Sequence, residues 1–187
     1  MKPILPVILA FILFIPSFAA TAAGDSLVAA CARCHGADGN SSGGQYPSLA
    51  RQTKEYLVKQ ILDYKTGARK DIQMSPMVGV ISAEDAHTLA KFYSGENIQK
   101  QRGIDKDLAA KGKKIAADLK CASCHQNNYR GKKEVPRLSR QKRVYLVKQL
   151  KDYRDGKRTN DNGVKTAEVK NLTDEQITAL THYFSGL

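Results

Sequence analysis

The sequence has no tryptophan, and aromatic residues make up only 7 % of its 187 positions. Apart from its N-terminal segment, it has no apolar run near the roughly 20 residues that a membrane-spanning helix needs. It also lacks any useful length of alternating apolar and polar residues, which argues against strands. With 42 % apolar and 26 % charged residues, the chain is expected to be soluble, globular and helical.

The N-terminal segment has the pattern of a secretory signal peptide. Lys2 supplies the positive end, residues 4–18 form an apolar run, and residues 20–23 are small. The run is shorter than a membrane span, so an uncleaved anchor is the weaker interpretation. We therefore expect residues 1–23 to be removed, which leaves an exported mature chain without a transmembrane segment.

The four cysteines lie in two short motifs, Cys31-Ala-Arg-Cys34-His35 and Cys121-Ala-Ser-Cys124-His125. Exported proteins usually pair their cysteines in disulfides, but Cys-x-x-Cys-His is typical of c-type haem attachment. Two thiols at this spacing can bond the two vinyl groups of a haem, and the adjacent imidazole can reach its iron. A thioredoxin-like pair would need a preceding strand, and a zinc site would need neighbouring cysteine pairs. The motifs therefore predict two covalently bound haem c groups, with both histidines as iron ligands.

The chain also repeats itself. At an offset of 89 residues, 13 of the 25 positions in residues 46–70 are identical to those in 135–159. The cysteine motifs repeat at an offset of 90, and residues 82–95 match 173–186 at an offset of 91. Three ordered blocks at nearly one spacing indicate a duplicated domain, because two copies are too few for a solenoid.

Each copy is predicted to consist of helices joined by polar loops. Ser82 to Asp85 and Thr173 to Gln176 have capping-box patterns that start helices. Gly67 is expected to stop the helix before it. The helices are expected at residues 27–32, 54–66, 82–93, 106–119 and 173–184. The predicted fold is therefore all-α, with one domain over residues 24–98 and a second over 104–187.

The mature chain resembles the dihaem cytochrome c4 family over its whole length. The matching motifs are Cys31–Asn40, Tyr46–Ala50, Tyr56–Ile61 and Met74–Met77 in the first half, and Cys121–His125, Pro136, Tyr145–Gln149 and Arg158–Asp161 in the second. The resemblance implies two class I cytochrome c domains related by a pseudo-twofold axis. It also implies electron transfer in the periplasm, from a donor dehydrogenase or bc1-type complex to an acceptor such as a terminal oxidase. By the same likeness, the carbonyls of Pro47 and Pro136 would accept the N–H groups of the proximal imidazoles.

The resemblance also implies a methionine sulfur as the sixth iron ligand, which raises the reduction potential. The first half contains Met74 and Met77. The family pattern has the ligand two residues before a proline, here Pro76, so Met74 is the predicted ligand. Met77 is the alternative.

The second half has no methionine, and matching the final helices puts Lys165 opposite Met74. Three interpretations stay open. Lys165 binds the iron through its neutral amine, or the position is open or holds water, or another side chain moves in. His182 aligns with Lys91 and is expected at the surface. A nitrogen ligand would lower the potential of the second haem, so electrons would pass from the second haem to the first.

The positive charge is concentrated in the second half of the chain. The formal net charge is +12. Residues 24–103 hold 10 Lys and Arg against 8 Asp and Glu, whereas residues 104–187 hold 19 against 10. The densest basic region contains Arg130, Lys132, Lys133, Arg137, Arg140, Lys142 and Arg143. Such a field favours docking to the acidic surface of a redox protein and also allows loose contact with anionic lipid. Nucleic acid belongs to another compartment and is not expected as a partner.

Three functions compete at this level. The first is an electron carrier, in which no residue needs to act as an acid, base or nucleophile. The second is a redox subunit dedicated to one dehydrogenase, for instance of thiosulfate. The third is a haem enzyme or small-ligand sensor with an open second haem, which binding of carbon monoxide to the reduced protein would reveal.

Overall fold

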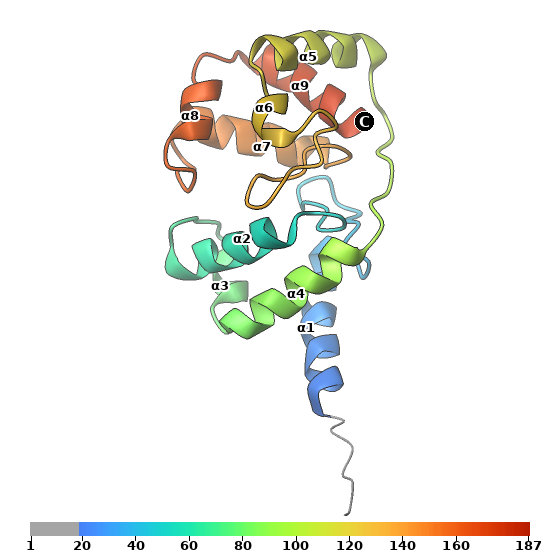
Figure 1. Cartoon of the computed structure of the whole chain (residues 1–187), viewed down its shortest axis with the longest axis vertical. Coiled ribbons are helices and arrows are strands. Elements are labelled where there is room, and N and C mark those ends of the chain that lie inside the picture. Colours follow the sequence, from blue (N-terminus) through green and yellow to red (C-terminus); the bar gives the residue numbers. More distant parts are fainter. Residues whose placement is uncertain (1–18) are drawn as a thin grey trace, which may run out of the picture.

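The structure is a computed structural model that describes residues 19–187, with side chains from Gly24 onward. Most of the predicted signal peptide lies outside the described residues. Within them the chain forms nine helices and no strand, apart from one isolated bridge between Lys132 and Val135 (Figure 1). The prediction of an all-α fold is confirmed.

The first lobe consists of four helices. They are α1 (Ala19–His35), α2 (Lys54–Thr66), α3 (Met74–Val78) and α4 (Ala83–Gly95). Helix α4 packs against α2 and α1, and its apolar face carries Ala86, Leu89 and Tyr93, which are all at most 3 % exposed. Leu57 of α2 completes this core from the opposite side. The lobe thus has its own small hydrophobic core. Helix α2 contributes to this core and also faces the second lobe.

The second lobe repeats this plan. It consists of α5 (Lys106–Asp118), α6 (Ala122–His125), α7 (Arg143–Arg154), α8 (Val164–Val169) and α9 (Asp174–Gly186). Helices α5 and α9 cross closely at Gly112, where a Cβ atom would lie 2.1 Å from the carbonyl oxygen of Ala179. Ile177 and Leu180 of α9 are buried against Ala116 of α5. This core is separate from that of the first lobe.

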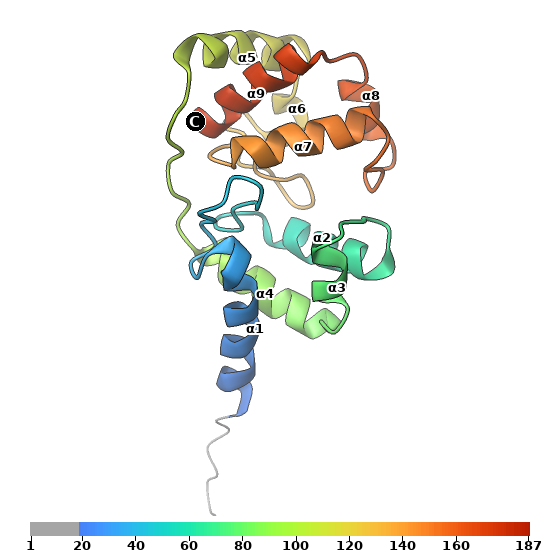
Figure 2. The same cartoon turned by 180° about the vertical axis from the view of Figure 1, so that it is seen from behind.

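The two lobes are stacked, with α2 and α7 facing each other, and one extended segment links α4 to α5 along one side (Figures 1 and 2). Two glutamine side chains join the lobes reciprocally. Gln141 accepts a hydrogen bond from the Ser48 amide at 2.7 Å and donates to the Ser48 carbonyl at 2.9 Å. Gln52 accepts from the Arg137 amide at 2.7 Å and donates to the Arg137 carbonyl at 3.2 Å. These matched contacts relate the lobes by the predicted pseudo-twofold symmetry.

Most sequence-based element predictions are confirmed. Helix α2 spans the predicted residues, and Gly67 ends it in the left-handed conformation, at φ 78°. Both capping boxes form, at the starts of α4 and α9. Helix α1 begins earlier than the predicted residue 27, and helices α3, α6, α7 and α8 were not among the predicted ranges. Among residues 19–187, no helix has the length and hydropathy needed to cross a membrane.

Candidate functional site

The two histidines of the cysteine motifs are held in the same way in both lobes. His35 ends α1 and His125 ends α6, and both are buried. Nδ1 of His35 lies 2.9 Å from the carbonyl oxygen of Pro47, and Nδ1 of His125 lies 2.8 Å from that of Pro136. Since a carbonyl can only accept, Nδ1 carries the proton and Nε2 keeps its lone pair for a metal. The expected role of both proline carbonyls is confirmed.

The cysteines lie beside these histidines and form no disulfide in the part of the chain that the structure describes. Cys31 and Cys121 are half-buried, whereas Cys34 and Cys124 are exposed. Burial raises the pKa of both half-buried thiols, and the neighbouring Cys34 raises that of Cys31 further. Over the described residues, no group of three His, Cys, Asp or Glu side chains is arranged to hold a metal ion.

Both motifs line one cavity of about 930 Å³ between the lobes. Ligand pockets usually have volumes of about 300–1,000 Å³, so this cavity lies near the upper end of that range. Its apolar lining comes from both hydrophobic cores, for example Leu57 and Leu89 of the first and Leu146 and Leu180 of the second. A cavity of this kind accommodates large apolar groups in contact with both cysteine motifs.

Residues of α3 and α8 line the same cavity, and the two helices occupy equivalent places in the two lobes. Val78 and Val169 are both buried, and each carbonyl accepts a hydrogen bond from the amide three residues later. The same number of residues separates Met74 from Val78 and Lys165 from Val169. The structure therefore equates Lys165 with Met74, as the sequence match predicted.

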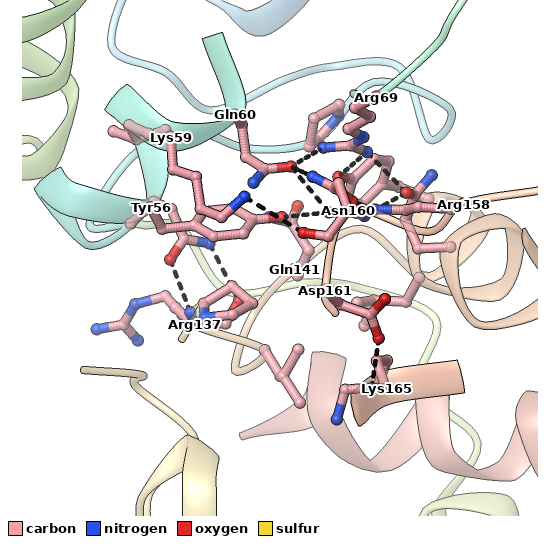
Figure 3. A pocket seen from close by; sticks show the side chains of 18 of the residues that line it. Tyr56, Lys59, Gln60, Arg69, Arg137, Gln141, Arg158, Asn160, Asp161 and Lys165 are labelled. Carbon is pink, nitrogen blue, oxygen red and sulfur yellow. Dashed lines mark hydrogen bonds between the residues drawn. The ribbon is translucent and has the colours of Figure 1, made fainter. Parts of the chain in front are cut away.

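Met74 and Lys165 are both half-buried and both line the cavity. The backbone amide of Met74 donates to the carboxylate of Asp71 at 3.1 Å. In the same way, the backbone amide of Lys165 donates to the carboxylate of Asp161. Figure 3 shows Lys165 beside Asp161. Met77 also lines the cavity but is 52 % exposed, so Met74 is the more buried of the two methionines.

Lys165 and His125 are close enough to interact electrostatically across the second half of the cavity. The pKa of His125 falls to about 4, mainly through burial and also through the Lys165 ammonium, although the bond to Pro136 opposes the shift. Burial likewise lowers the pKa of His35, where the bond to Pro47 opposes it. Both imidazoles are therefore neutral at pH 7, the state in which they can bind a metal.

Two buried arginines, Arg69 and Arg158, lie where the lobes meet at the cavity wall. Figure 3 shows them converging on Gln60 and Asn160. In the described part of the chain, no carboxylate forms an ion pair with either guanidinium. A buried charge requires a partner, so an acidic group in the cavity would complete this site.

The residues therefore fit two haem c groups. Paired thiols beside metal-ready imidazoles suit covalent porphyrin attachment, the apolar walls suit the ring, and the arginine pair suits its propionates. The arginines were not singled out as site residues from the sequence, although their identity between the two repeats was visible there.

The expected exposure of His182 is wrong. The side chain is only 6 % exposed, and its Nδ1 accepts a hydrogen bond from the Asp105 amide at 3.0 Å. It is buried because it packs under the start of α5, a contact that the alignment with Lys91 could not reveal. His182 does not line the cavity, so it is not placed to bind an iron there.

A group of arginines lies near the Pro136 side of the cavity. Arg137 donates to the Arg51 carbonyl at 2.8 Å and to the Ser139 hydroxyl at 2.7 Å. Its pKa falls to about 10 through burial and through the nearby charges of Arg130, Arg51 and Arg140. Like charges held close together form a surface that attracts anions.

Comparison with known proteins gives a consistent result. A family model described as Cytochrome c matches residues 21–97 and 109–187. Cytochrome c4 of Pseudomonas aeruginosa is 34 % identical over 89 % of this chain and 88 % of that protein. The thiosulfate dehydrogenase electron acceptor of Thiomonas intermedia is 31 % identical over 100 % of this chain and 91 % of that protein. The solved structure of reduced cytochrome c4 from Pseudomonas stutzeri matches with a TM-score of 0.82 and 34 % identity, covering 89 % of this chain and 97 % of that one.

Proposed function

The chain belongs to the cytochrome c4 family of cytochromes c, and from this premise we propose that it carries electrons between redox proteins in the periplasm. The donor would be a dehydrogenase or a bc1-type complex, and the acceptor an enzyme such as a terminal oxidase. The observation that carries the proposal is the single cavity lined by both cysteine motifs. Because two haems in one cavity lie close together, an electron entering at one lobe can leave from the other.

The protein is an electron-transfer cytochrome with two covalently bound haem c groups, which supply iron that takes up and releases single electrons. We propose that the first haem is bonded to Cys31 and Cys34 and the second to Cys121 and Cys124. His35 and His125 would bind the irons through Nε2, with their rings oriented by the carbonyls of the following prolines. These residues bind and orient the groups, and none needs to transfer a proton.

We propose Met74 as the sixth ligand of the first iron and Lys165 as that of the second. The support is their equivalent position in α3 and α8 and their shared place in the cavity lining. An amine must lose its proton to bind, and a metal competes for the same lone pair. The two haems would then differ in potential, and electrons would pass from the second to the first.

The domain limits follow from the same arrangement. We propose that residues 24–98 and 104–187 form the two domains and that residues 1–23 are removed on export. The two hydrophobic cores and the extended segment between α4 and α5 support the division. The segment 1–18 lies outside the described residues, so the signal peptide rests on the sequence pattern alone.

A second candidate function is that of a dedicated electron acceptor for one dehydrogenase, which oxidises thiosulfate or a related sulfur compound. The similarity to the electron acceptor of a thiosulfate dehydrogenase favours it. In either case the basic second lobe would dock on an acidic surface, which gives fast association at low salt. Arg130, Arg137 and Arg140 of this lobe, together with Arg51 of the first, are a candidate for this contact.

The test uses the holoprotein purified from a host that matures c-type cytochromes. Its mass should exceed that of the mature polypeptide by two haems, and replacing Cys121 and Cys124 by Ala should remove one. Stopped-flow absorbance then follows its reduction by a thiosulfate dehydrogenase with thiosulfate, and its oxidation by membranes containing a terminal oxidase. Fast turnover with the membranes supports the general carrier, and reduction by the dehydrogenase alone supports the dedicated subunit. A reduced protein that exchanges electrons with neither and binds carbon monoxide would overturn both in favour of an enzyme or sensor.

A further inference from the structure

The two buried arginines at the cavity wall are crossed between the lobes. Nη2 of Arg69, in the first lobe, donates to the Tyr145 hydroxyl at 3.1 Å and to Gln149 Oε1 at 2.7 Å, both in the second. Nη2 of Arg158, in the second lobe, donates to the Tyr56 hydroxyl at 3.2 Å and to Gln60 Oε1 at 2.8 Å, both in the first. Each guanidinium is thus bonded to side chains of the opposite lobe.

Each arginine is also bonded within its own lobe. Arg69 donates to Gln60 Oε1 at 2.6 Å, and Arg158 donates to Gln149 Oε1 at 2.5 Å. Gln60 and Gln149 therefore each accept from both arginines. The guanidinium carbon of Arg69 lies 4.5 Å from the centroid of the Tyr64 ring, and Arg158 lies at the same distance from Tyr153. These contacts hold the two guanidinium groups in one rigid network.

The network brings two positive charges together, and neither forms an ion pair with a carboxylate of residues 24–187. Asp63 reaches the network through Asn160 and Gln60, whose side-chain amides donate to its carboxylate at 2.5 Å and 3.3 Å, and it already pairs with Lys59 at 2.5 Å. Arg69 and Arg158 are 6 % and 7 % exposed, so water screens them little. They line the same cavity as His35 and His125. Their charge therefore acts on whatever occupies that cavity, from both lobes.

We infer that Arg69 and Arg158 form one charged unit that serves both haems, so that each arginine raises the reduction potential of the haem in the opposite domain as well as its own. The inference rests on the proposed function, because it presumes a haem at each cysteine motif. Reduction lowers the positive charge on a haem by one, and a buried cation favours the reduced form in a medium of low dielectric constant. An arginine that binds a propionate acts in the same direction, since it offsets a negative charge that stabilises the oxidised iron.

The experiment is a redox titration of the holoprotein followed by NMR, which reports each haem through its own resonances. The variants are Arg69→Gln and Arg158→Gln, which remove the charge, and Arg69→Lys and Arg158→Lys, which keep it. Each Gln variant should shift both midpoint potentials to more negative values, and each Lys variant should restore most of the shift. The matched control is Arg154→Gln, because Arg154 pairs with Asp155 at 2.9 Å and does not line the cavity. It should leave both potentials unchanged.

Two results would overturn the inference. Either Arg69→Gln shifts only the first haem and Arg158→Gln only the second, or neither potential changes. If one Gln variant fails to incorporate haem, the other Gln variant decides, because each alone is expected to shift both potentials. These outcomes are separate from the proposed function, because potentials are measured without a protein partner.

Discussion

Lys165 occupies in α8 the place that Met74 occupies in α3, although the two lobes are otherwise built to one plan. Both residues follow an aspartate that accepts a hydrogen bond from their backbone amide, and both line the cavity. A thioether and an amine have different preferences for the two oxidation states of iron. The duplication thus provides two similar haem sites, and this one difference would give them unequal potentials.

Replacing Lys165 by Met should convert the second haem to histidine–methionine ligation and raise its potential towards that of the first. The physical reason is that thioether sulfur favours the reduced iron more than an amine does. Absorption and EPR spectroscopy of the oxidised protein, with a redox titration, measure the change. The control is Lys170→Met, because Lys170 ends the same helix, is exposed and does not line the cavity. An Lys165→Met spectrum identical to that of the wild type would exclude Lys165 as the ligand.

Replacing Gln141 by Ala should weaken the contact between the lobes. Ser48 is 1 % exposed, and both its amide and its carbonyl would lose their partner. An unsatisfied buried polar group costs about 1–3 kcal/mol, so the free energy of unfolding should fall by at least about 1 kcal/mol in denaturant titrations. Gln73→Ala, at an exposed position before α3, is the control and should change little. Equal stability of the two variants would mean that the Gln141 contact contributes nothing.

Replacing Gly112 by Ala should destabilise the second lobe. The new Cβ would lie 2.1 Å from the Ala179 carbonyl oxygen, so α5 and α9 would have to move apart. Overpacking of this kind typically costs about 1–3 kcal/mol, measured as a lower free energy of unfolding. Gly95→Ala is the matched control, because Gly95 also lies in a helix and nothing is within 4 Å of a Cβ there. If both variants were equally stable, the close helix crossing would be refuted.

His182 should make the protein less stable in mild acid. Its pKa is lowered mainly by burial and also by Arg143, while Asp105 opposes the shift. In the unfolded chain the pKa of His182 has its ordinary value of about 6.5. The unfolded chain therefore binds a proton at His182 more readily than the folded chain does. The stabilisation is complete above about pH 6.5 and is lost as the pH falls below it. Denaturant titrations from pH 8 to pH 5 should show a smaller pH dependence for His182→Gln than for the wild type. His87→Gln, at an exposed position in α4, should behave as the wild type does.

The two helix-starting capping boxes show how far local sequence can predict structure. Ser82 with Asp85 and Thr173 with Gln176 satisfy backbone groups within one turn, so their structure depends on residues close in the sequence. Gly67 is similar, because its conformation follows from the lack of a side chain. Burial of His182 was predicted wrongly because it depends on Asp105, which is distant in the sequence.

The sequence by itself determined the all-α class, the duplication, the two haem-binding motifs and the lack of a methionine in the second half. These features follow from the spacing of residues within short motifs and from the repeat along the chain, both of which can be read directly from the sequence. Only the tertiary structure decided that both motifs line one cavity and that Arg69 and Arg158 are bonded across the lobes. The reason is that the partners of a buried charge depend on which residues lie near it in the folded protein. Residues about 80 to 100 positions apart in the sequence come into contact only when the two lobes are stacked.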